Sequence, residues 1–420
     1  MRFTTWFALE TAWKVMMGLS LVLGWSARAE TPLEPEPLAQ GTLAERQQAA
    51  ARRVLATGWG RSMVLSPSGD VWVWGTGSGA TLGTWPEHKF GTGLPVRMPR
   101  MSGAVSLSTT TVNGHSLALL ADGTVEAWGS NSYGQLGDGT VGGSRNTPAP
   151  VPGLSHVVAV AAGDKHSLAL KRDGSVWAWG ANHFSQLGDV TLNDSPLPVQ
   201  VQGLQGVASI HAGDDVSVAV RTDGTVWTWG SDATLWDWDA EILPSPAAPA
   251  PGLSNVVKVS MVTAGLIALR SDGTARQWYL GGPDWPWAVF PHAPVENLTG
   301  AVDLVTGSNT LHILRADGTV WNFGGNSYGE RGFPTEEPTS LELAQVPGLS
   351  GGVSLFSQGA TVYALRADGT LMAWGRNHAG NLGNGVSPVQ PRPARVLLPC
   401  KLKDLSTGEG VREQQCHAEP

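Results

Sequence analysis

The chain has 420 residues, with 54 glycines, 28 prolines and 19 tryptophans, and only 15% of its residues are charged. Short apolar stretches separated by glycine and proline are typical of an all-β protein with frequent turns. The formal net charge of −8 provides no basic surface for nucleic acid or for an anionic membrane, so neither is expected as a partner.

Residues 1–29 have the pattern of a secretory signal peptide. Arg2 and Lys14 precede an apolar stretch at 15–25, and residues 27–29 form a small-x-small cleavage site. The stretch is too short to span a bilayer. We therefore expect cleavage after Ala29, a secreted, periplasmic or cell-surface location, and no membrane insertion afterwards. A retained N-terminal anchor is the alternative.

Two segments flank the main part of the chain. Residues 30–50 are rich in proline and glutamate, which predicts a linker, with a possible short helix over about 43–50. Residues 400–420 form a tail that contains both cysteines of the chain, Cys400 and Cys416. In an exported protein this pair indicates one disulfide across the tail, and two free thiols are the alternative.

One eight-residue pattern, DGSVWAWG at 173–180, recurs along the chain. The Asp-Gly pair predicts a tight hairpin turn, and the alternating apolar residues predict the strand that follows it. Seven copies stand 45–54 residues apart, so each repeat is one structural module whose apolar faces are covered by its neighbours. The hairpin glycines of the seven copies are Gly69, Gly123, Gly174, Gly224, Gly273, Gly318 and Gly369.

Each repeat holds four short strands. In the third repeat they are a Pro-Val strand at 150–151 and apolar strands at 157–163, 166–170 and 176–180. Four antiparallel strands in meander order form one blade of a β-propeller. The runs alternate with period two and no helical face persists, which excludes leucine-rich and helical repeats.

The repeat resembles a known family. The pattern ALxxDGxVxxWG is combined with NSYGQLG at 131–137, NHFSQLG at 182–188, NSYGERG at 326–332 and NHAGNLG at 377–383. This combination is similar to the RCC1-type repeat, and the resemblance covers residues 51–399. It implies an all-β fold, a seven-bladed β-propeller of four-stranded antiparallel blades.

The position of the Pro-Val strands predicts how the ring closes. One such strand follows every hairpin, and the final copy stands at 393–396, but none precedes the first repeat, which opens at residue 52. We therefore expect a C-terminal strand at about 394–398 to pair with the N-terminal blade. Such closure removes free sheet edges.

Residues that could carry chemistry recur with the repeat. His115 and His166 are each followed by a serine, but neighbouring residues on a strand point to opposite faces, which favours a structural role. The paired tryptophans of the hairpin strands share one face and are expected in the core. No motif of a catalytic, metal-binding or cofactor-binding site is present, so we predict a protein without catalytic residues, metal or cofactor.

The loops that depart from the repeat are the candidate binding sites. They follow the first, fourth and fifth hairpins, and their tryptophans fall outside the strand pattern. Aromatic and acidic residues on loops are typical of protein-binding hot spots. The alternative is that they fold back over a blade end that has lost its usual turn. The candidate residues are Trp85, Phe90, Trp236, Asp237, Trp238, Asp239, Asp284, Trp285 and Trp287.

These observations favour an exported, monomeric, non-catalytic propeller that engages a protein partner through its rim loops. Secreted bacterial propellers of this type include a β-lactamase-inhibiting protein, so inhibition of an enzyme is one form of this hypothesis. A second hypothesis is guanine-nucleotide exchange on a small GTPase, as in the eukaryotic namesake of the family. A third is a polysaccharide-active enzyme that works in the central channel.

Overall fold

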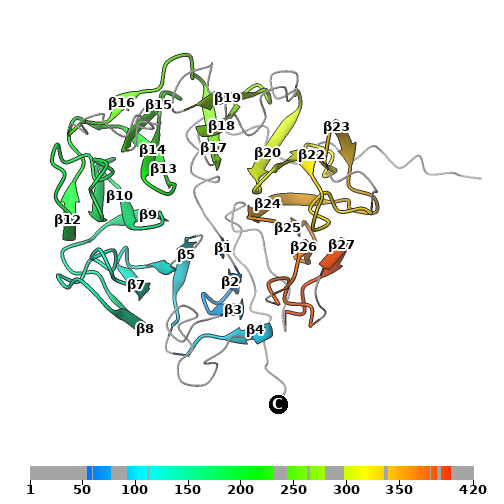
Figure 1. Cartoon of the computed structure of the whole chain (residues 1–420), viewed down its shortest axis with the longest axis horizontal. Helices are drawn as coiled ribbons and strands as arrows, with labels where there is room; N and C mark the ends of the chain where they lie inside the picture. The colour runs from blue at the N-terminus through cyan, green and yellow to red at the C-terminus, as the bar shows by residue number, and fades with distance from the viewer. Residues whose placement is uncertain are drawn as a thin grey trace, which may run out of the picture. The chain divides into compact units, whose positions relative to one another are not determined.

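The computed structural model describes residues 54–58, 60–76, 92–99, 101–110, 114–230, 244–262, 265–279, 298–334, 339–378, 380–385 and 389–398. All of them belong to one compact unit, Pro37–Pro420. They form seven antiparallel sheets arranged in a ring, each packed against the next and the last against the first (Figure 1). The predicted all-β, seven-bladed propeller is therefore confirmed.

The strands follow one another around the ring in chain order. The first four blades contain β1 (Leu55–Gly58), β2 (Arg61–Leu65), β3 (Val71–Gly75), β4 (Thr92–Arg97), β5 (Ala104–Thr109), β6 (His115–Leu120), β7 (Val125–Ser130), β8 (Ser144–Pro150), β9 (Val157–Ala162), β10 (His166–Lys171), β11 (Val176–Gly180), β12 (Ser195–Gln200), β13 (Val207–Ala212), β14 (Val216–Arg221), β15 (Val226–Gly230) and β16 (Ala248–Pro249). The last three contain β17 (Val256–Val262), β18 (Gly265–Arg270), β19 (Ala275–Tyr279), β20 (Ala301–Thr306), β21 (Thr310–Arg315), β22 (Val320–Gly325), β23 (Thr339–Gln345), β24 (Gly352–Gln358), β25 (Thr361–Arg366), β26 (Leu371–Arg376) and β27 (Val389–Arg395).

Each blade is a meander of consecutive strands. Six sheets have four strands, and the sheet of the fifth blade has three, β17–β19, within the described residues. The repeated Asp-Gly pair makes the turn between the second and third strands. Gly174 has a φ of 82°, which glycine adopts without a steric penalty, and Asp173 Oδ1 accepts hydrogen bonds from the backbone nitrogen and the hydroxyl of Ser175. The repeated motif therefore sets the turn and the strands beside it.

The predicted closure by strand exchange is wrong. The C-terminal strand β27 pairs with β26 of its own blade, with Met372 opposite Arg395, and β1–β4 form a complete first blade by themselves. The proline-containing strand is thus the fourth, outer strand of each repeat rather than the first strand of the next. The chain then crosses to the inner strand of the following blade.

Proline explains why this strand lies at the outer edge. Proline has no N–H group and cannot pair on both sides, so it is tolerated only at the edge of a sheet. The outer strand β12 contains Pro196 and Pro198, and β27 contains Pro391 and Pro393. These prolines also protect the perimeter of the ring against pairing with another chain.

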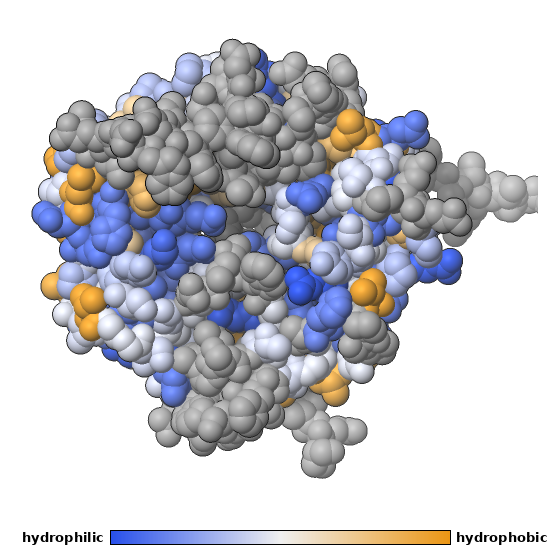
Figure 2. Space-filling model, viewed as in Figure 1, coloured by the Kyte–Doolittle hydropathy of each residue, from blue (hydrophilic) through white to orange (hydrophobic). Residues whose placement is uncertain are grey.

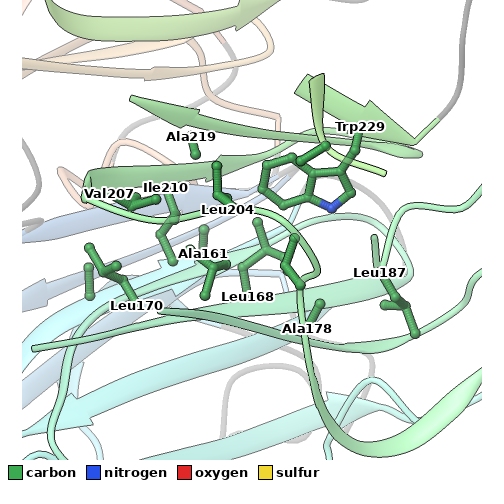
Figure 3. Packing of buried hydrophobic residues seen from close by; sticks show 14 residues of the cluster. Ala161, Leu168, Leu170, Ala178, Leu187, Leu204, Val207, Ile210, Ala219 and Trp229 are labelled. Atoms are coloured by element: carbon green, nitrogen blue, oxygen red, sulfur yellow. The ribbon is translucent and has the colours of Figure 1, made fainter. Parts of the chain in front are cut away.

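The hydrophobic core lies between the blades. Leu168 of β10 and Ala178 of β11 point toward Ile210 of β13 and Trp229 of β15, and all four are buried (Figure 3). An equivalent cluster joins the last blade to the first and includes Val396, which follows β27. The ring is therefore closed by the same kind of packing that joins every other pair of blades. Among the described residues, no helix is long and apolar enough to cross a membrane.

Candidate protein-binding face

The two ends of the blades differ in the connections that they carry. We call the end with the Asp-Gly turns the hairpin face. The other end, the loop face, carries the short turns 163–165 and 213–215 and the longer loops 131–143 and 181–194, because antiparallel strands place these connections together. Loops on rigid scaffolds are where binding residues concentrate.

The loop-face motif NxxGQLG builds a rigid turn. Asn131 Oδ1 accepts a hydrogen bond from the backbone nitrogen of Leu136 at 3.0 Å, and Asn182 makes the same bond to Leu187. The Gln135 side chain accepts a further bond from the backbone nitrogen of Tyr133. The asparagine and glutamine of the motif therefore satisfy backbone groups that an irregular loop would otherwise leave unpaired.

The same motif also connects its own blade to the following one. The carbonyl oxygen of Gln135 accepts two hydrogen bonds from the following blade, from Ser167 Oγ and from Trp179 Nε1, both at 2.9 Å. His115 Nε2 lies 2.7 Å from Ser167 Oγ. Because the serine proton goes to Gln135, the histidine must donate to the serine, which places its proton on Nε2. We call this set of four residues the blade latch.

The latch recurs around the ring. Between the third and fourth blades, His166 contacts Ser217, and Gln186 O accepts from Ser217 and Trp229. Between the last and first blades, Tyr363 takes the place of the histidine. Its hydroxyl lies 2.7 Å from Ser62 Oγ, and Asn381 O accepts from Tyr363, Ser62 and Trp74. Ring closure therefore uses a variant of the same latch.

Neither repeated His-Ser pair is a nucleophilic site. Ser116 contacts Thr109 at 3.0 Å, while the adjacent His115 reaches Ser167 of the next blade, so the two side chains diverge. Burial, together with nearby Arg61 and His166, lowers the pKa of His115 to about 3. Burial lowers the pKa of His166 to about 3 as well. Both imidazoles are neutral at pH 7 and serve the structure.

Two aromatic pairs lie on the loop face. The rings of Tyr133 and His183, from the second and third blades, meet edge to face with centroids 5.8 Å apart. The rings of Tyr328 and His378, from the sixth and seventh blades, meet in the same way at 6.0 Å. Both histidines are exposed, and each pair joins two successive blades.

A basic side chain accompanies each pair. Lys165 Nζ lies 5.7 Å from the centroid of the Tyr133 ring, and the guanidinium carbon of Arg376 lies 5.1 Å from that of Tyr328. Tyr328 is 37% exposed. Partly exposed tyrosine, histidine and basic side chains on fixed loops are well suited to contact another protein, because aromatic rings and arginine dominate binding hot spots.

Carboxylates gather on the loop face beside the first aromatic pair. Burial, helped by nearby Asp164 and Asp215, raises the pKa of Asp214 to about 6, while Lys165 acts in the opposite direction. Lys165 Nζ lies 4.0 Å from Asp215 Oδ1. Figure 2 shows hydrophilic surface over the sector of the ring where β9–β14 lie. Within the described ranges, no group of three or more histidine, cysteine, aspartate or glutamate side chains is arranged to hold a metal ion.

The binding residues predicted from the sequence all lie outside the described residues. Trp85 and Phe90, the residues 236–239 and the residues 284–287 are among them, as are Cys400 and Cys416. The strands that precede the three loops, β3, β15 and β19, end at the loop face.

The sequence reasoning missed Tyr133, His183, Tyr328 and His378. They stand inside the repeated motif, so they were interpreted only as part of the repeat. The signal that could have found them is their variation within the motif. The second position of the motif is serine or histidine, and the third is tyrosine, phenylalanine or alanine.

Comparison with known proteins agrees with the repeat architecture. A sequence model described as "Regulator of chromosome condensation (RCC1) repeat" matches residues 122–170 and 173–220, and a second RCC1 repeat model matches 157–186. Residues 122–220, from the hairpin of the second blade into the fourth blade, therefore match RCC1-type repeats. The matched residues cover β9–β11, the blade with the regular latch on both sides.

Among curated relatives, the ultraviolet-B receptor UVR8 of Arabidopsis thaliana is 27% identical over 398 residues, covering 89% of this chain and 77% of the receptor. The Homo sapiens E3 ubiquitin-protein ligase HERC2 is 32% identical over 139 residues, covering 33% of this chain. That match spans only 3% of the length of the ligase.

Two solved structures of similar fold have low sequence identity. Yeast RCC1 (Prp20), solved with Kap60 bound, is 20% identical with a TM-score of 0.45, covering 81% of this chain and 74% of that one. Human WBSCR16 is 22% identical with a TM-score of 0.43, covering 83% and 82%.

Proposed function

We propose that this RCC1-type propeller binds a protein partner on its loop face. The observation that carries the proposal is the pair of partly exposed Tyr-His contacts, each with a basic residue over the tyrosine ring, on loops held by the asparagine of the repeated motif. Because these loops are fixed by hydrogen bonds, little conformational entropy is lost when they contact a partner.

A relative whose match covers 89% of this chain supports a role of this class, since UVR8 is named as a receptor. A propeller that receives a signal and a propeller that recruits a partner both rely on a rigid ring that presents loops on one face. The irregular loops after β3, β15 and β19 belong to this proposal, because the strands before them end at the loop face.

We further propose that the chain is exported and that cleavage after Ala29 leaves Glu30 at the N-terminus. Inhibition of an enzyme is the specific form of binding that fits a rigid, exported propeller. N-terminal sequencing of protein recovered from medium or periplasm tests the first point, and Glu30 is the expected first residue. A chain that still begins at Met1 in the cytosol would exclude export.

Site-specific photo-crosslinking tests the binding face. A photoreactive amino acid replaces exposed His183 or exposed His378 on the loop face, or exposed Arg172 on the hairpin face as the matched control. We expect both loop-face positions to capture a discrete partner in the native host and Arg172 to capture none. Equal capture from both faces, or none from the loop face, would refute the proposal.

A second experiment tests the irregular loops. We expect the double substitution Trp236→Ala and Trp285→Ala to reduce capture of the partner that His183 and His378 crosslink. Unchanged capture would remove these loops from the binding face, while leaving the aromatic pairs in place.

A further inference from the structure

Arg61 is a buried charge without a carboxylate partner among the described residues. It is the first residue of β2, at the loop-face end of that strand, and it is 5% exposed. Its Nε and Nη2 donate to Thr109 Oγ1 at 3.0 and 2.8 Å, and Nη2 also donates to His115 O at 3.3 Å. Burial lowers the pKa of Arg61 to about 10, so the group is charged at pH 7. A buried charge that meets only neutral acceptors is costly unless an opposite charge compensates it.

The backbone makes room for this guanidinium group. A side-chain carbon added at Gly114 would overlap Arg61 Nη1, and one added at Gly58 would lie 3.4 Å from Arg61 Nε. Arg61 takes the place that His115 and His166 hold at the start of the second strand in the next two blades. The junction between the first and second blades therefore has a positive charge where the following junctions have a neutral imidazole.

Hydrogen bonds extend from this charge across the second blade. Thr109, Ser116 and Trp128 are cross-strand neighbours in one row of β5, β6 and β7, so their side chains share one face of the sheet. Thr109 Oγ1 has two lone pairs, and both accept from Arg61. Ser116 Oγ, which lies 3.0 Å from Thr109 Oγ1, therefore cannot donate to it. The hydroxyl proton of Ser116 remains available for another acceptor.

Trp128 provides a second proton that lacks an acceptor. Its Nε1 is buried, and no described residue accepts from it. In the third blade the equivalent serine and tryptophan both donate to the carbonyl oxygen of Gln135. The first repeat lacks the motif that supplies this oxygen, since its sequence reads TLGTWPEHKF at 81–90. By analogy with the third blade, the protons of Ser116 and Trp128 converge on one place where the described residues supply no acceptor.

We propose that a small monovalent anion such as chloride occupies this place, which we call the anion site. Ser116 and Trp128 donate to the anion directly, and the charge of Arg61 stabilises it through Thr109. The anion replaces the motif carbonyl and completes the latch between the first and second blades. An anion is favoured over water because only a negative charge compensates the buried guanidinium group.

Anomalous diffraction from crystals of the full-length protein grown in bromide tests the location. We expect a bromide peak within hydrogen-bond distance of Ser116 Oγ and Trp128 Nε1. A water molecule at that place, or an oxygen atom of the chain itself, would overturn the proposal.

Unfolding in solution provides a second measurement. Urea midpoints are recorded while chloride replaces isethionate, a larger organic anion, at constant ionic strength. We expect the midpoint to rise with chloride concentration, because a ligand that binds only the folded state stabilises it. A midpoint that does not depend on chloride would contradict the anion site.

Two tryptophan variants distinguish the anion site from a general effect of salt. Trp128→Phe removes the indole N–H that faces the anion, whereas Trp179→Phe removes one that donates to the carbonyl oxygen of Gln135. We expect the chloride dependence to be lost in Trp128→Phe and retained in Trp179→Phe. The same chloride dependence in both variants would overturn the proposal.

Removal of the charge tests the role of the guanidinium group. We expect Arg61→Met to raise the chloride concentration that gives half of the stabilisation about tenfold. Arg172→Met is the matched control, because Arg172 is exposed on the hairpin face, and it should leave that concentration unchanged. Equal values in the two variants would show that Arg61 does not hold the anion.

Discussion

The blade latch predicts a large effect for the removal of one hydroxyl group. The substitution Ser167→Ala deletes the atom that accepts from His115 Nε2 and donates to Gln135 O. Gln135 O keeps its bond from Trp179 Nε1, so the uncompensated group is the His115 N–H. Both ring nitrogens of His115 would then be buried without a partner, since its Nδ1 already has none.

A buried donor left without an acceptor costs about 1–3 kcal/mol, so Ser167→Ala should destabilise the protein by about 2 kcal/mol. Urea denaturation followed by tryptophan fluorescence and circular dichroism measures this as a lower midpoint at an unchanged slope. Ser132→Ala is the control, because Ser132 is an exposed serine of a loop-face turn. We expect its effect to stay within about 0.5 kcal/mol.

A double-mutant cycle isolates the contact. In a His115→Leu background the unsatisfied donor is gone, so Ser167→Ala should cost less than it does in the wild type. If Ser167→Ala and Ser132→Ala shift the midpoint equally, or if the cost is the same in both backgrounds, the latch does not stabilise the ring as argued.

Three further predictions concern charge and backbone geometry. Burial lowers the pKa of three histidines (His115, His166 and His312) to about 3, so these groups take up protons on unfolding below pH 6.5. The free energy of unfolding should therefore fall by up to about 1.4 kcal/mol per pH unit for each histidine as the pH drops toward 3. Urea midpoints at several pH values measure this fall, and midpoints that do not change with pH would contradict it. Asp303→Ala removes the partner of Lys258, a mostly buried lysine on the preceding blade, and should cost about 3–5 kcal/mol. Asp70→Ala, which removes a surface ion pair, should cost under about 1 kcal/mol. Gly129→Ala should destabilise more than Gly142→Ala, since both have positive φ but only a side chain at Gly129 would overlap a backbone carbonyl, and equal melting temperatures would refute this.

The repeat pattern was sufficient to predict the fold because its information is local and is stated seven times. An Asp-Gly pair specifies the turn by backbone geometry, and alternating apolar residues specify the two faces of each strand. The central tryptophans, such as Trp179 and Trp374, are fully buried between blades, as the alternation predicts.

The local sequence pattern could not predict how the ring closes. A proline-containing strand between two hairpins can belong to the blade before it or to the blade after it, and the order of residues is the same in both cases. The structure decides for the preceding blade, where Pro196 and Pro198 stand on the outer edge strand β12. The choice between the two blades depends on which strand pairs with the proline-containing strand. That partner is distant in sequence if the strand closes another blade, and near in sequence if the blade is a meander.

The candidate binding face also combines features that the sequence predicts with features that only the tertiary structure shows. Sequence by itself determined that the chain is a ring of seven antiparallel blades, because turns and strand faces depend on neighbouring residues. Only the tertiary structure decided that the carbonyl of Gln135 joins two blades, that Tyr133 meets His183, and that Arg61 is buried against Thr109. These contacts join residues about 30–50 positions apart or depend on the conformation that the assembled ring imposes, so no local pattern encodes them.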